Sequence, residues 1–193
     1  MGLRFQISKI LRNSYFAGHV NYDNIAAAAD GIVTVVNLTN ASLTVAAQPD
    51  VPRNMVITIV DTTNSIVAGT ITITGIGAYG QTLVETFDCS TGDTVDSGVF
   101  TGNKAFATVA SVVASGFSVL GGAGDETVKV ATGNKIGLPC YKLKDVYKAC
   151  VDGADETIGT HNLTYGTITP NTAANGTRDY DFWFTYYPVP EVY

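Results

Sequence analysis

Cysteine and histidine side chains are common zinc ligands and often form the nucleophile and base of a catalytic pair. The 193-residue sequence holds few of them, with 3 cysteines (Cys89, Cys140 and Cys150) and 2 histidines (His19 and His161). No Cys-x-x-Cys pair is present, and neither histidine lies near a cysteine or in a His-x-x-x-His pattern. The spacing therefore predicts no metal site, no cofactor site and no Cys–His catalytic pair.

A disulfide between Cys140 and Cys150 would form only if the segment between them doubled back on itself. Thiols stay reduced in a cytoplasm, where we expect this protein to be made. We therefore expect free cysteines.

Two pairs of aspartates, Asp93 with Asp96 and Asp152 with Asp155, offer the oxygen ligands that calcium prefers. Neither pair has the spacing of an EF-hand loop or of a calcium-binding nonapeptide repeat. We expect these acids to be solvated in loops. Because no other set of residues forms a catalytic constellation, the sequence indicates a protein that is not an enzyme.

The segment Gly75-Ile76-Gly77-Ala78-Tyr79-Gly80 formally matches the dinucleotide-binding fingerprint Gly-x-Gly-x-x-Gly. That fingerprint works where the last glycine opens a helix whose N-terminal amides hold a pyrophosphate. Here Gln81 to Phe87 instead alternates in polarity like a strand. The pattern therefore predicts a hairpin turn that needs positive φ angles and has no affinity for nucleotides.

Positive charge is scarce, because 11 Lys and Arg stand against 17 Asp and Glu, which gives a formal net charge of -6. Binding to nucleic acid phosphates needs clustered Lys and Arg, so the charge argues against it. Lys142, Lys144 and Lys148 form one loose basic cluster, which we interpret as a solvated face. No apolar stretch reaches the length of a membrane span, and no secretory signal follows the N-terminus, so we expect neither a membrane nor secretion.

The elements that carry these residues are predicted to be strands. The chain has 25 Thr, 22 Val and 13 Ile against 9 Leu and 4 Glu, which favours β structure. The expected strands are 32–36, 42–45, 54–60, 69–75, 81–87, 99–100, 104–109, 111–113, 117–120, 127–131, 135–138 and 164–169. Residues 141–151 fit either a strand or a short helix, and 24–30 could form a helical turn. Many short strands with glycine turns indicate an all-β fold, an antiparallel β-sandwich of the jelly-roll type.

We divide the chain into an N-terminal arm or short helix, residues 1–30, and a β-sandwich domain, residues 31–193. The arm carries apolar residues without an obvious place in the sandwich, and we take them as interface candidates: Phe5, Ile7, Ile10, Leu11, Tyr15 and Phe16. Such residues need cover from their own domain, from a sister subunit or from the capsid, and we expect a sister subunit to supply it by accepting the arm as an extra strand. Deletion of residues 1–22 is then expected to leave a folded domain with weaker assembly.

The segment 179–187 is unusually rich in aromatic residues. As a strand it would place Tyr180, Phe182, Phe184 and Tyr186 on one face and Trp183 and Tyr187 on the other. Two interpretations stay open: a central core strand, or a strand whose second face is covered by a neighbouring subunit, since Tyr and Trp are enriched at interfaces. Trp183 and Tyr187 are therefore further interface candidates.

Three segments, QPDVPRNMVITI, GTITITGIGAYGQTLVETF and GNKAFATVASV, fall within about residues 48 to 113. Their order is a Pro-Asp-x-Pro-Arg loop, a strand, a hairpin with a glycine turn, a Glu-Thr strand and Lys-Ala-Phe-x-Thr-Val. In this region the chain resembles virion structural proteins of tailed bacteriophages, and most of all head decoration or cement proteins with a jelly-roll fold.

The resemblance implies a non-enzymatic protein that stabilises a capsid by bridging major capsid proteins on the exterior of the virion. It implies a homo-oligomer, which we expect to be a trimer, and no catalytic residues. Two alternatives stay open: a tail-tube or head-tail connector protein, and a carbohydrate-binding β-sandwich. The second would be marked by exposed aromatic residues beside Asp and Asn.

Overall fold

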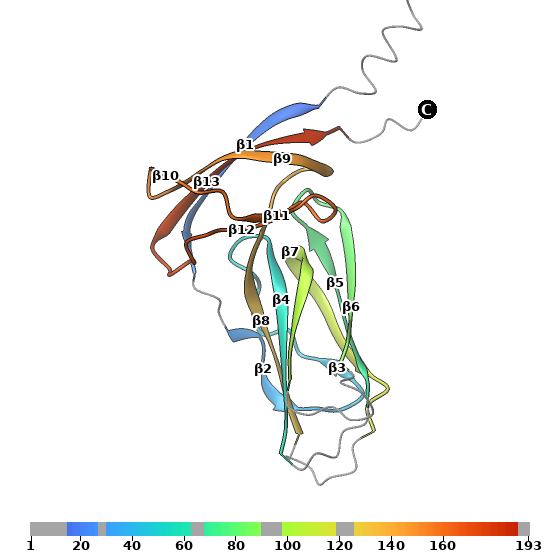
Figure 1. Cartoon of the computed structure of the whole chain (residues 1–193). Helices are drawn as coiled ribbons and strands as arrows, with labels where there is room; N and C mark the ends of the chain where they lie inside the picture. Colours follow the sequence, from blue (N-terminus) through green and yellow to red (C-terminus); the bar gives the residue numbers. More distant parts are fainter. Residues whose placement is uncertain (1–14, 27–29, 63–67, 90–97, 119–125, 189–193) are drawn as a thin grey trace, which may run out of the picture.

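A computed structural model describes residues 15–26, 30–62, 68–89, 98–118 and 126–188. In this part of the chain every regular element is a strand (Figure 1). The strands are β1 (Phe16–Ile25), β2 (Asp30–Asn37), β3 (Ser42–Leu43), β4 (Arg53–Asp61), β5 (Thr70–Gly77), β6 (Thr82–Asp88), β7 (Gly98–Ser115), β8 (Glu126–Gly137), β9 (Lys142–Val151), β10 (Ala154–Glu156), β11 (Thr160–Asn162), β12 (Thr167–Thr169) and β13 (Arg178–Tyr187).

The strands form two sheets, and every pairing is antiparallel. The larger sheet has 9 strands in the order β11-β12-β8-β4-β7-β5-β6, with β2 added to β8 and β3 to β7. It curls into a half-barrel, and the smaller sheet, of order β1-β13-β9-β10, lies across one end of it (Figure 1). The expected all-β, antiparallel fold is confirmed, and the jelly-roll topology stays a prediction.

Alternation of side chains builds the core of the larger sheet. Ile71 and Ile73 of β5 are fully buried, whereas the threonines between them face outward. One of those threonines, Thr72, shares a hydrogen bond of 3.1 Å with Thr86 on β6. The inner face packs with isoleucines and valines of β2, β4 and β8 and with Phe87 and Phe106 into one hydrophobic core. The two-residue period in the sequence thus predicted correctly which side of β5 is buried.

A second core joins the two sheets. Tyr180, Phe182 and Phe184 of β13 are almost completely buried there, as the alternation predicted. They pack with Ile136 of β8 and Ile168 of β12, which belong to the larger sheet. The segment 179–187 is therefore a core strand on one of its faces.

The first strand belongs to the folded domain. Residues 16–25 lie inside the range predicted to be an arm, yet they form β1 and pair along their length with β13 of the same chain, for example Gly18 with Phe184. Val20 and Tyr22 pack against the second core. The expectation that residues 16–22 form an arm outside the domain is therefore wrong, because β13 of the same chain supplies their strand partner. Residues 1–14 lie outside the described residues.

Two other ambiguous segments are also extended. Residues 142–151 form β9, so the alternative of a short helix at 141–151 is wrong. Of the helical turn predicted at 24–30, Asn24 and Ile25 end β1 and Asp30 starts β2, and residues 27–29 lie outside the described residues. Ile25 pairs with β13 and Asp30 with β8, whereas Asn24 lies at a bulge of β1 with a φ of 51°.

Strands β7 and β8 are longer than the sequence predicted. Several short strands were expected between residues 99 and 113, and two strands around Gly133, but β7 runs unbroken for 18 residues and β8 for 12. The glycines interpreted as breaks lie at shifts of register, Gly102 opposite the step between Asn54 and Val56 and Gly133 opposite the step between Arg53 and Met55. These glycines therefore accommodate β-bulges inside strands and are not turns.

The glycine-rich segment 75–80 runs from the last residues of β5 into a hairpin turn, and the turn itself is as predicted. It connects β5 to β6, which pair in register from Thr70 with Asp88 to Ile76 with Thr82. Gly80 has a φ of 88°, which an L side chain rarely adopts, and its N–H donates to the Gly77 carbonyl at 3.0 Å. No helix N-terminus is formed here for a pyrophosphate to bind.

Candidate functional site

The interface candidates that the structure describes lie on β1 and β13 of the smaller sheet or directly beside them, with Trp183 in the middle of β13 and the others near one end of this strand pair. Tyr15, Trp183 and Tyr187 share the outer face of this sheet, the side turned away from the second core. Phe16 lies on the opposite side, at the margin of the core, with its ring 5.9 Å from that of Tyr186. Tyr15 is 52% exposed and Phe16 is 51% exposed. The remaining candidates, Phe5, Ile7, Ile10 and Leu11, lie outside the described residues.

Each of the three outer aromatic rings lies beneath a lysine of β9. The Nζ atom of Lys144 is 3.1 Å from the ring centroid of Tyr15, that of Lys148 is 5.0 Å from Trp183, and that of Lys142 is 5.6 Å from Tyr187. Such cation–π contacts contribute roughly 0.5–1 kcal/mol each at exposed sites. We call these six residues the lysine–aromatic face. The sequence predicted the lysines only as a solvated cluster, because their aromatic partners lie on other strands.

Polar side chains contact Trp183 within this face. The His19 ring stacks on the indole with centroids 4.5 Å apart, and its Nε2 atom lies 2.8 Å from the Asp181 carboxylate. On the other side, Lys148 forms an ion pair of 2.9 Å with Asp155. The hydrogen bond and charge of Asp155 raise the pKa of Lys148, and Lys148 lowers the pKa of Asp155 in return.

Lys142 and Lys144 differ from Lys148 in their charge balance. Neither forms an ion pair with any described residue. Each ammonium group instead lies over an aromatic ring. Lys142 and Lys144 thus place two positive charges beside three partly exposed rings, in a sheet that also carries the carboxylates of Asp145, Asp155 and Asp181. An anionic or aromatic surface of a partner would complement the lysine–aromatic face.

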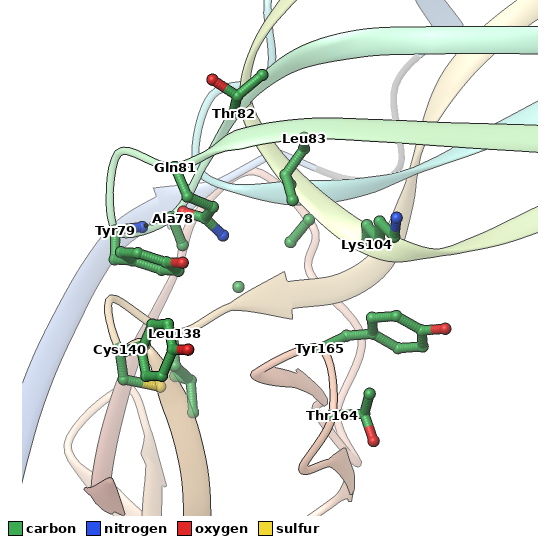
Figure 2. A pocket seen from close by; sticks show the side chains of 13 residues that line it. Ala78, Tyr79, Gln81, Thr82, Leu83, Lys104, Leu138, Cys140, Thr164 and Tyr165 are labelled. Carbon is green, nitrogen blue, oxygen red and sulfur yellow. Dashed lines mark hydrogen bonds between the residues drawn. The ribbon is translucent and has the colours of Figure 1, made fainter. Parts of the chain in front are cut away.

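A cleft of about 280 Å³ lies where the two sheets meet (Figure 2). Three turns that are far apart in the sequence bring a tyrosine to it: Tyr79 between β5 and β6, Tyr141 between β8 and β9, and Tyr165 between β11 and β12. Lys104 of β7 and Cys140 also line it. No local pattern in the sequence indicates this cleft, apart from a tyrosine inside the segment Gly75–Gly80.

Among the residues that the structure describes, no three His, Cys, Asp or Glu side chains form a cluster able to hold a metal ion. The three cysteines are free and buried, as expected from the sequence. Burial raises the pKa of both Cys89 and Cys140 to about 12, so these thiols stay protonated and unreactive at neutral pH.

Within the same residues, no helix has the length and apolar character to cross a membrane. Comparison of the chain with known protein families, with curated proteins and with solved structures finds no match.

Proposed function

We propose that this protein is a non-enzymatic structural component of a tailed-phage virion that decorates the capsid exterior. In this proposal it assembles as a homotrimer and stabilises the shell by bridging major capsid proteins, without nucleic acid, membrane or cofactor. The observation that carries the proposal is the lysine–aromatic face of the smaller sheet.

This face has the composition of a contact surface. Tyr and Trp are enriched among the residues that dominate binding energy at protein interfaces. The rings of Tyr15, Trp183 and Tyr187 are already oriented by lysines and by His19, so little side-chain entropy remains to be lost on docking. Lys142 and Lys144 supply charge that would steer the face toward an acidic partner surface.

The edge of the same sheet adds a second means of contact. β1 is the terminal strand of the order β1-β13-β9-β10, so its outer edge has no strand neighbour among the described residues. An unpaired edge offers backbone N–H and C=O groups to a partner strand. On a capsid, weak contacts of this kind are strengthened by repetition at many lattice sites.

The test is to locate the protein on particles. The protein is labelled with gold and incubated with purified virions of the phage that encodes it. The particles are then imaged by electron microscopy. Regular labelling of heads supports the proposal, as does loss of this labelling in a Trp183→Ala/Tyr187→Ala variant. Labelling of tails alone would instead favour a tail-tube or connector role, and unlabelled particles would overturn a virion role. The oligomeric state is measured in parallel by light scattering, where a monomer would contradict the trimer.

A further inference from the structure

The cleft between the sheets is separate from the lysine–aromatic face and is lined by different turns. Its three tyrosines, Tyr79, Tyr141 and Tyr165, are 38%, 41% and 42% exposed, so each ring is half covered by protein and half open to a ligand. Figure 2 places Tyr79 and Tyr165 on opposite sides of the cleft, with Lys104 on the side of Tyr165. The rings of Tyr79 and Tyr141 meet edge to face, with centroids 5.9 Å apart.

Side-chain hydrogen bonds fix the turns that carry these rings. The side-chain oxygen Oδ1 of Asn162 accepts hydrogen bonds from the backbone N–H groups of Thr164 and Tyr165, at 3.0 and 3.2 Å. The Gln81 side chain accepts from the N–H of Tyr79 at 3.2 Å. Leu138, which precedes Tyr141, donates its N–H to the Gly166 carbonyl at 2.8 Å and so ties two of the turns together. The cleft is therefore formed before any ligand arrives, which lowers the entropy cost of binding.

The polar groups of the cleft are suited to a ligand rich in hydroxyls. The hydroxyls of the three tyrosines make no hydrogen bond with another described residue, and Gln81, Thr82 and Thr164 add further donors and acceptors. The ammonium group of Lys104 donates one hydrogen bond to the Val84 carbonyl at 2.5 Å, and its two other N–H donors are available to a ligand. No carboxylate is among the described residues that line the cleft. The site can therefore accept hydrogen bonds from a neutral or anionic ligand and donate to it.

We propose that this cleft binds a saccharide, neutral or anionic, as one or two sugar rings of a longer glycan. A sugar ring has an apolar C–H face that stacks on an exposed aromatic ring and an edge of hydroxyls that needs nearby donors and acceptors. Both requirements meet here, and a volume of about 280 Å³ lies at the small end of ligand sites, which suits a ring better than an extended peptide. Glycan binding of this kind goes beyond attachment to a capsid and does not depend on it.

The experiment uses the full-length protein and an array of defined glycans carrying neutral hexoses, N-acetylhexosamines, uronic acids and sialic acid. The strongest binder is then titrated by calorimetry against four variants. Tyr165→Ala and Tyr79→Ala each remove a stacking ring and are expected to weaken binding about tenfold or more. Tyr165→Phe keeps the ring, so it should retain more affinity than Tyr165→Ala. Tyr147→Ala removes an equally exposed tyrosine of β9 outside the cleft and should leave affinity unchanged.

Thermal melting identifies any variant that fails to fold. If Tyr79→Ala does not fold, the affinities of Tyr165→Phe and Tyr165→Ala can still be compared. The proposal is overturned if no glycan binds, if binding survives both alanine substitutions, or if the cleft selects members of a random peptide library and no glycan. The two alanine variants should still label phage heads, so failure of this inference and failure of the capsid role are told apart.

Discussion

The side-chain oxygen of Asn54 accepts a hydrogen bond of 2.8 Å from the backbone N–H of Lys135 across the boundary between β4 and β8. The amide nitrogen of the same side chain donates to the Gly102 carbonyl of β7 at 3.0 Å. Asn54 is completely buried, and each of its two neighbouring strands carries a bulge beside it. One amide thus serves both bulges.

Replacement of Asn54 by alanine is expected to lower the free energy of unfolding by about 2–3 kcal/mol, because the part-buried N–H of Lys135 loses its acceptor and the buried Gly102 carbonyl loses a donor. Urea unfolding measures the change. Thr86→Ala removes an exposed hydrogen bond on β6 and should change stability by less than about 0.5 kcal/mol. Equal losses in the two variants would contradict the role assigned to Asn54.

Gly133 and Asn54 are expected to be energetically coupled. A Cβ atom on residue 133 would overlap the Asn54 amide, so Gly133→Ala should destabilise the protein when Asn54 is present. In the Asn54→Ala background that overlap disappears, and the second substitution should cost little. A double-mutant cycle measures the coupling, and strictly additive losses would contradict the contact.

Alkaline pH is expected to destabilise the protein through Cys89 and Cys140. Their pKa is raised from 9.0 to about 12 in the folded state, so between these pH values the folded chain holds protons that the unfolded chain has lost. The free energy of unfolding therefore falls as pH rises through this window, by about 1 kcal/mol per pH unit for each thiol. Urea midpoints from pH 8 to 10.5 test this.

A Cys89→Ala/Cys140→Ala variant serves as the control and should have a shallower alkaline slope than the parent protein. Part of the slope should remain, since burial also raises the pKa of Tyr22. Identical slopes in the two proteins would show that the thiols are not the cause.

Two truncations separate a role in assembly from a role in folding. Removal of residues 1–14 leaves β1 whole, whereas removal of residues 1–22 takes away most of β1 and uncovers β13 and the second core. The longer deletion should lower the melting temperature by about 10 °C or more, and the shorter one should lower it little. Calorimetry and size-exclusion chromatography measure both effects. Similar melting temperatures for the two truncations would contradict the placement of β1 in the core.

Trp183 is the only tryptophan of the chain, so its fluorescence reports directly on the lysine–aromatic face. If this face is covered in the assembly, acrylamide should quench Trp183 less in the assembled protein than in the dilute monomer. A Lys142→Glu/Lys144→Glu variant should assemble more weakly, and Tyr147→Ala should assemble normally. Unchanged quenching on assembly would place the contact elsewhere on the surface.

Strands with strict alternation could be predicted from the sequence, including which side is buried. β5 and β13 are examples, because Ile71 and Phe182 repeat with their neighbours at the two-residue period of a sheet. β7 and β8 were each predicted as two or more shorter strands. A glycine in a β-bulge cannot be distinguished from a glycine in a turn until the partner strand is known. β1 was missed because its outward residues, such as His19 and Asn21, are polar while Gly18 interrupts its inner face.

The candidate sites depend on pairings that no local pattern contains. Each lysine of the lysine–aromatic face finds its ring on another strand, and the cleft collects Tyr79, Tyr141 and Tyr165 from three separate turns. A sequence alone does not distinguish an aromatic residue that binds a partner from one that packs in the core. Only the strand order distinguishes the two roles.

The pairing of β1 with β13 has a consequence for how the protein is made. β1 is synthesised well before β13, and contacts such as His19 with Asp181 span 162 positions. The half-barrel can close while synthesis continues, but the smaller sheet must wait until β13 has left the ribosome. Until then Val20 and Tyr22 lack their core partners, a state in which a nascent chain is open to chaperones and to mispairing with its sisters. We therefore expect folding of this protein to be limited by a late step that joins β1 to β13.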